Sequence, residues 1–118
     1  MTESGVQPTV PATAFFAVDM RVGRVVECEP LRGARQPAYR MLIDLGPLGA
    51  RRSSARLTDN YTPEQLLGTL VVAVVNLPPR QVGSVRSEVL VLGAYQRGGT
   101  AVGLLRPDGD CSPGDRIG

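Results

Sequence analysis

Apolar and polar residues alternate along much of the first half of the chain, which is the pattern of β-strands with one buried face. Valine-rich or alternating runs at residues 20–29, 39–45 and 50–57 predict three strands, separated by turns that contain Gly or Pro. Within the first run, Gly23 predicts a bulge or a sharp bend, as small barrels need at their corners.

The pattern changes at residues 62–68, which carry the signals of a short helix. Thr62 is placed to cap its N-terminus, Pro63 takes the first helical position, and Gln65 completes a capping box. Gly68 is placed to end the helix. We therefore expect one helix between the third strand and the next element of the chain.

The remainder of the chain adds further strands and a short N-terminal element. The apolar run at residues 69–75 predicts a buried central strand. We predict a mobile tail at 1–12, a short helix at 13–19, a loop at 76–85, a fifth strand at 87–94, a hairpin turn at 96–99 and a strand at 100–105.

Five strands or slightly more, with one short helix after the third, is the order of an oligonucleotide/oligosaccharide-binding (OB) barrel. The fold class is therefore expected to be all-β with short helices. The length of 118 residues fits one domain, at 13–118, following the tail. In this fold, ligands bind on the face of the second and third strands and on the adjacent loops.

Composition excludes most catalytic chemistry. The chain has no His and no Lys, which rules out a Ser–His or Cys–His pair, an imidazole metal ligand, a Walker A loop and a Schiff base. Cys28 and Cys111 are too few for a zinc site and are expected to be free buried thiols, with a disulfide as the alternative. Glu27 and Glu29 share one side of a strand, where exposed charges are commoner than an acid/base pair. We expect neither an enzyme nor a bound metal or cofactor.

The first twelve residues and the longest apolar run bear on the cellular location of the protein. The first twelve residues lack the basic and apolar regions of a secretory signal, and the run at 70–75 is far too short to span a bilayer. These features predict a cytoplasmic protein without membrane insertion.

Arginines are concentrated in the first half of the chain. Residues 21–56 hold eight arginines against three acids, although the formal net charge of the whole chain is only +2. The segment ARRSSARL at 50–57 combines three arginines with two serines, side chains that hold phosphate oxygens. One interpretation is a nucleic-acid-binding strand; the alternative is a solvated edge strand whose charges prevent aggregation. The predicted order of strands and helix, which is that of an OB barrel, favours the first interpretation, because it puts this segment where that fold binds ligands.

Four segments carry a resemblance to a known family. They are DMRVGRV at 19–25, ARQPAYRMLIDLG at 34–46, SSARLTDNYTPEQLLG at 53–68 and VVAVVNLPPRQVGSVRSEVLVLG at 71–93. Together they resemble the CsaA-type secretion chaperones and the tRNA-binding domains appended to methionyl- and phenylalanyl-tRNA synthetases. The resemblance implies an OB barrel that forms a homodimer and binds tRNA. For CsaA-type members, it also implies affinity for unfolded or presecretory polypeptides.

The resemblance also implies particular site residues, among them Asn76 and Ser87, which match recurrent family positions. Alternatively, Asn76 caps a loop and Ser87 bonds only to backbone. Tyr39 and Tyr61 either stack on bases or belong to the core. The residues expected to bind nucleic acid are Arg32, Arg35, Tyr39, Arg40, Arg51, Arg52, Ser53, Ser54, Arg56, Asn76 and Ser87.

Apolar residues outside the predicted core suggest a second surface, for polypeptides or for a partner subunit. These residues are Phe15, Phe16, Leu77, Pro78, Pro79 and Val82. The two phenylalanines and the C-terminal residues 111–118 have no obvious place in a closed barrel, so we expect them to form the dimer contacts. The function is thus expected to be tRNA binding together with a chaperone role in protein export; the alternative is a peptide-binding secretion chaperone without significant tRNA binding.

Overall fold

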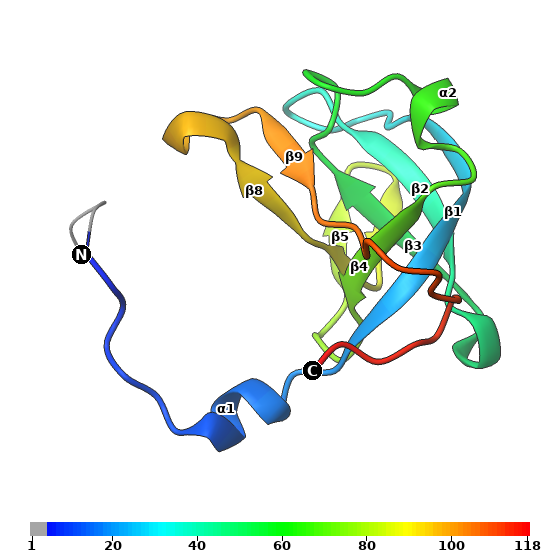
Figure 1. Ribbon diagram of the computed structural model, residues 1–118. Helices are drawn as coiled ribbons and strands as arrows, with labels where there is room; N and C mark the ends of the chain where they lie inside the picture. The colour runs from blue at the N-terminus through cyan, green and yellow to red at the C-terminus, as the bar shows by residue number, and fades with distance from the viewer. Residues whose placement is uncertain (1–4) are drawn as a thin grey trace.

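Five antiparallel strands of one sheet form a nearly closed barrel in the computed structural model, which describes residues 5–118 (Figure 1). The strands follow the order β3-β2-β1-β4-β7, so β3 and β7 are the two edges of the sheet. The expected all-β OB architecture with short helices is confirmed. The barrel strands are β1 (Met20–Pro30), β2 (Tyr39–Asp44), β3 (Ala50–Ala55), β4 (Leu70–Val74) and β7 (Leu90–Val91).

The remaining elements are short. They are α1 (Ala12–Phe16), η1 (Gly46–Leu48), α2 (Pro63–Leu66), β5 (Arg80–Val82), β6 (Val85–Ser87), β8 (Gly93–Tyr95), η2 (Gln96–Gly98) and β9 (Val102–Leu104).

Three of the expected elements have to be corrected. The predicted loop at 76–85 contains most of an antiparallel hairpin, β5–β6, and the predicted strand at 87–94 is divided into β7 and β8. The predicted helix at 13–19 is shorter and begins one residue earlier, at Ala12. The expected mobile tail at 1–12 falls partly on residues 1–4, which lie outside the described residues.

The helix signal at 62–68 gives the expected structure. The Thr62 side chain accepts a hydrogen bond from the Gln65 backbone N–H, and the Gln65 side chain accepts one from the Thr62 backbone N–H. Gly68 follows the helix with a φ of 82°, a conformation that glycine adopts without strain. The α2 helix therefore leads from β3 into the buried strand β4 as predicted.

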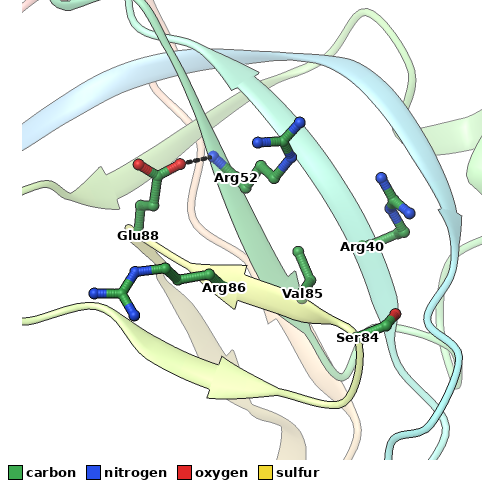
Figure 2. Close-up of a pocket in the computed structure, with 6 residues that line it drawn as sticks. All are labelled: Arg40, Arg52, Ser84, Val85, Arg86 and Glu88. Atoms are coloured by element: carbon green, nitrogen blue, oxygen red, sulfur yellow. Dashed lines mark hydrogen bonds between the residues drawn. The ribbon is translucent and has the colours of Figure 1, made fainter.

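The two edges of the sheet are joined by hydrogen bonds between β3 and the residues that precede β7. The Glu88 backbone N–H donates to the Arg52 carbonyl at 2.8 Å, and the Arg52 N–H donates to Glu88 Oε1 at 3.0 Å (Figure 2). The Ser54 N–H donates to Ser87 Oγ at 3.1 Å. Side chains thus complete the closure where backbone pairing stops, and they hold the β5–β6 hairpin against β3.

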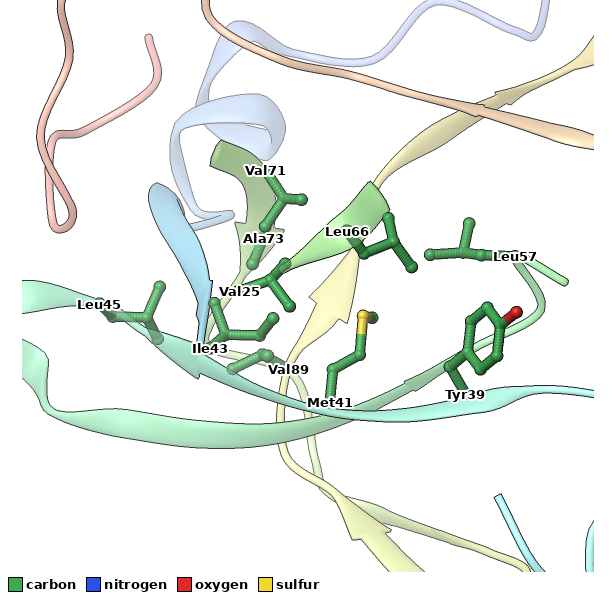
Figure 3. Packing of buried hydrophobic residues seen from close by; sticks show 10 residues of the cluster. All are labelled: Val25, Tyr39, Met41, Ile43, Leu45, Leu57, Leu66, Val71, Ala73 and Val89. Atoms are coloured by element: carbon green, nitrogen blue, oxygen red, sulfur yellow. The ribbon is translucent and has the colours of Figure 1, made fainter. Parts of the chain in front are cut away.

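The core fills the barrel with buried, mostly apolar side chains from β1, β2, β4, α2 and the segment just before β7 (Figure 3). Ile43 of β2, Val25 of β1 and Val71 of β4 are completely buried, and Leu66 of α2 closes one end. β3 contributes Ser53 instead, whose buried Oγ donates to the Val89 carbonyl at 3.0 Å. That bond satisfies the hydroxyl inside an otherwise apolar interior.

Gly23 has a different role from the one predicted. The pairing of β1 with β2 shifts register between Val25 and Glu27, so the bulge lies three residues beyond the glycine. Gly23 faces the core, and a Cβ there would overlap the Ile43 side chain and touch that of Leu45. The missing side chain makes room for these two neighbours rather than for a bend.

The two ends of the chain differ in how they meet the barrel. The C-terminal segment runs along β1, with Ile117 N–H donating to the Met20 carbonyl at 2.9 Å and Gly114 N–H to the Val22 carbonyl at 2.8 Å. The tail therefore has a place in its own barrel, contrary to expectation. By contrast, α1 has no buried residue and lies apart from the barrel (Figure 1).

Both cysteines are free, as expected, although each is half-buried rather than buried. Burial, with smaller contributions from the carboxylates of Glu64 and Glu29, raises the pKa of the Cys28 thiol to about 11. A thiol with this pKa remains protonated at neutral pH, and the thiolate is the reactive form. Cys28 is therefore expected to be inert toward thiol reagents near pH 7.

Candidate nucleic-acid interface

The outer face of β1, β2 and β3 carries the charged side chains that the sequence singles out. Arg40 pairs with Ser54 across β2 and β3, and Leu42 pairs with Arg52. Because side chains alternate between the two faces of a strand, Arg52 and Ser54 point outward while Ser53 points into the core. The arginines and serines of β3 therefore do not all share one face.

The β5–β6 hairpin lies over this face and borders an open hollow of about 410 Å³. Figure 2 shows Val85 at the centre of the hollow, with the Arg40 and Arg52 guanidinium groups on one side and Arg86 and Glu88 on the other. The residues that line it are Arg40, Arg52, Ser84, Val85, Arg86 and Glu88.

The loop after β1 meets the tip of the hairpin at one end of the hollow. The Ser84 N–H donates to the Arg32 carbonyl at 3.1 Å, and a Cβ on Gly83 would overlap that same carbonyl oxygen. Gly83 has a φ of 55°, which the tight turn requires. The two loops that flank the binding face of an OB fold are thus held together here.

The charges in the hollow are only partly neutralised by the protein. Arg40 Nε lies 3.1 Å from Glu29 Oε1, which leaves the terminal nitrogens of Arg40 facing outward. One oxygen of Glu88 accepts the Arg52 backbone N–H. Among residues 5–118, neither the Arg52 nor the Arg86 guanidinium forms an ion pair. Two guanidinium groups and one carboxylate oxygen therefore remain available to a ligand.

The other predicted arginines surround this hollow or point away from it. Arg32 and Arg35 are exposed on the loop after β1, and Arg56 donates to Gln36 Oε1 on the same loop. Arg51 is half-buried opposite Ile43. Of the two arginines near the start of β1, Arg21 forms an ion pair with Asp19 and Arg24 donates to the Gly68 carbonyl at 2.7 Å, so the basic first half is spread over several faces.

Four of the expected nucleic-acid-binding residues have structural positions instead. Tyr39 is only 8% exposed, and its hydroxyl donates to the Tyr61 carbonyl at 2.8 Å, so it belongs to the core rather than to a stacking surface. Ser53 is buried, as described above. Ser87 Oγ bonds the backbone at Ser54 and Val89.

Asn76 is the fourth residue in this group. Its Oδ1 accepts from the Asp19 N–H and its Nδ2 donates to the Ala17 carbonyl, both at 2.8 Å. It thereby attaches the segment after α1 to the end of β4. We leave Tyr39, Ser53, Asn76 and Ser87 out of the interface, because each already uses its polar atoms within the fold.

The sequence analysis missed four residues of the hollow, namely Ser84, Val85, Arg86 and Glu88. The signal that would have found them is the sequence Val82-Gly83-Ser84-Val85, in which Gly-Ser separates two short β-prone segments. That pattern is typical of a two-residue hairpin turn. Assigning 76–85 to a loop hid the hairpin and with it Arg86.

The apolar residues expected to meet a polypeptide or a partner subunit are mostly exposed. Phe16 is 69% exposed and packs edge-on against Phe15, with ring centroids 5.3 Å apart. Leu77, Pro78 and Pro79 are exposed after β4, whereas Val82 is half-buried in the hairpin. These residues lie on separate elements, and both phenylalanine rings remain exposed.

Residues 5–118 contain no group of three or more potential metal-ligating side chains. Glu29 is engaged by Arg40, while Glu27 is exposed. In the same range, no helix has the length and apolar character needed to cross a membrane.

Known proteins resemble the chain over nearly all of its length. A family model described as "Putative tRNA binding domain" matches residues 20–116, a range that includes every strand. The chaperone CsaA of Bacillus anthracis is 41% identical, with a TM-score of 0.88 over 94% of this chain and 100% of its own. The CsaA chaperone of Picrophilus torridus is 40% identical, with a TM-score of 0.85 over 93% of this chain and 100% of its own.

A methionine–tRNA ligase of Thermotoga maritima is 34% identical over 116 residues, which are 98% of this chain but 18% of the ligase. The chain thus spans less than a fifth of that enzyme's length, and the likeness concerns one part of the ligase.

Proposed function

Since the chain belongs to the tRNA-binding domain family, we propose that it is an OB-fold module that binds tRNA on the outer face of β2 and β3 and has no catalytic activity of its own. The observation that carries this proposal is the hollow beside the β5–β6 hairpin, which is lined by arginines from three elements and in which only Arg40, through its Nε, forms an ion pair among the described residues. Guanidinium groups suit phosphate oxygens because they present several donors in a planar fork.

The proposed interface is centred on the hollow and extends along the loop after β1. Phosphate contacts from the rim position the RNA, whereas side chains within the hollow face a single nucleotide. Its members are Arg32, Arg35, Arg40, Arg52, Ser54, Arg56 and Arg86; Arg51 is left out because strand alternation puts it on the other face of β3.

A titration of the purified protein with bulk tRNA at 50 and 200 mM salt tests the proposal. Neutralising phosphates releases counterions, so the logarithm of the affinity is expected to fall by about 0.7 to 0.9 per contact for each log unit of salt. With three or four contacts, that predicts an affinity roughly twenty- to 150-fold lower at the higher salt. Absence of binding at low salt would reject the tRNA module.

A chaperone role for unfolded or presecretory polypeptides in protein export is a second proposed function. It is supported by the likeness to the two CsaA chaperones and by the exposed apolar residues Leu77, Pro78 and Pro79. The protein is expected to suppress aggregation of a chemically denatured client at stoichiometric amounts, as measured by light scattering. If tRNA does not bind and clients are protected, peptide handling without tRNA binding becomes the leading function.

We further propose a cytoplasmic homodimer in which α1 contacts the partner subunit. An exposed pair of phenylalanines on a helix that has no buried residue is costly to leave in water. Sedimentation is expected to give twice the monomer mass for the full chain and the monomer mass for a variant that begins at Asp19. A stable dimer of the shortened chain would remove α1 from the contact.

A further inference from the structure

We propose that the hollow beside the β5–β6 hairpin is a subsite for one unpaired guanine nucleotide, an inference that rests on the proposed RNA binding and specifies its ligand. The hollow is built from Arg40 and Arg52 on one side and Arg86 and Glu88 on the other, with Val85 between them (Figure 2). Each of these pairs suits a different part of a nucleotide.

Acidic and basic side chains line this hollow without forming ion pairs with one another. In the described part of the chain, Glu88 forms no ion pair with Arg52 or Arg86. Its Oε1 is fixed by the Arg52 backbone N–H, so the carboxylate is held in place while its second oxygen remains available. One carboxylate oxygen joins β3 to the segment before β7, and the other leaves a negative charge in the hollow that repels anions and attracts hydrogen-bond donors. The site is therefore suited to a ligand that presents both acceptors and donors.

Guanine has that combination. Its O6 and N7 atoms accept from an arginine in the commonest specific contact between proteins and bases. Its N1–H and N2–H groups are donors, and a carboxylate only accepts. Adenine and cytosine each offer one amino group with acceptors beside it, and uracil offers a single N–H. The Arg86 and Glu88 side of the hollow therefore complements guanine better than the other three bases.

The base must be unpaired to use this site. The N1–H and N2–H donors of guanine lie on its Watson–Crick edge, which is occupied in a duplex and available in single-stranded loops and ends. The volume of about 410 Å³ is near the lower end of small-ligand sites and fits one nucleotide rather than a helix. Val85 is buried and forms the floor of the hollow, and the Arg40 and Arg52 guanidinium groups on one side are suited to bind the adjoining phosphate.

The test measures fluorescence anisotropy with labelled uridine heptamers whose central base is G, A, C or U. The G-containing heptamer is expected to bind about fivefold more tightly than the all-uridine one, the lower end for a bidentate base contact. Glu88→Gln keeps an oxygen for the Arg52 N–H and replaces the free oxygen with a donor, so it is expected to abolish the preference for G. Glu64→Gln, which makes the same change on α2 outside the hollow, is the control and should preserve it.

Total tRNA binding is measured in parallel on the same proteins. If tRNA binds but all four heptamers bind equally, or none binds, the guanine subsite is wrong and the tRNA module stands. If no RNA of any kind binds, both proposals fail. A preference for G that persists in Glu88→Gln would also overturn the subsite as described. Circular dichroism and thermal unfolding of each variant verify that it is folded.

Discussion

The double substitution Arg40→Ala with Arg52→Ala is expected to weaken tRNA binding about a hundredfold at low salt. Hydrogen bonds to charged groups contribute about 1.5–3 kcal/mol each, and 1.4 kcal/mol corresponds to a factor of ten in affinity. Both guanidinium groups line the same side of the hollow (Figure 2), so one stretch of RNA backbone would lose two contacts. The salt slope should become shallower by about 0.7 to 0.9 for each phosphate contact removed.

The matched control is Arg97→Ala with Arg106→Ala. Both double variants lower the formal net charge from +2 to zero, but Arg97 and Arg106 are exposed and do not line the hollow. If affinity depends on where the charge lies, only the Arg40/Arg52 variant binds tRNA more weakly and shows a shallower dependence of affinity on salt. Equal losses in the two variants would mean that RNA responds to net charge alone, and the interface would have to be placed elsewhere.

The sequence predicted the fold well because its signals were local. The Thr62-Pro63-Glu64-Gln65 capping box and the continuous apolar run of β4 each depend on neighbouring residues, and both formed as expected. The site was predicted less well, since a binding face depends on which strands meet. Arg86 lies 46 residues from Arg40 in the chain, and only the closure of the barrel brings the two to one hollow.

The positions of individual residues show what a sequence pattern leaves undetermined. Ser53 and Ser54 are adjacent and chemically identical, yet one is inside the barrel and the other outside, because strand alternation separates them. The register that decides between them depends on the pairing with β2. Tyr39 likewise has the side chain of a base-stacking residue, but its position opposite Ala55 directs it into the core.

Gly23→Val is expected to lower the free energy of unfolding by about 3 kcal/mol, at the upper end for overpacking of a filled core. A side chain at this position would overlap that of Ile43, which is completely buried. Ile43→Ala alone is expected to cost a similar amount, about 3 kcal/mol, by leaving a cavity. Urea unfolding followed by circular dichroism measures both values.

Combining the two substitutions tests the contact itself. If Gly23 is a glycine because Ile43 occupies the space of its Cβ, Ile43→Ala makes room for the new valine. The double variant should then be more stable than the sum of the single effects by at least about 1 kcal/mol, as expected for residues in contact. Gly23→Val with Leu66→Ala is the control, since Leu66 is equally buried but is not among the nearest neighbours of that position. If the changes in unfolding free energy are additive in both pairs, Gly23 does not make room for Ile43. The glycine would then be needed for the backbone conformation of β1, as the predicted bend requires.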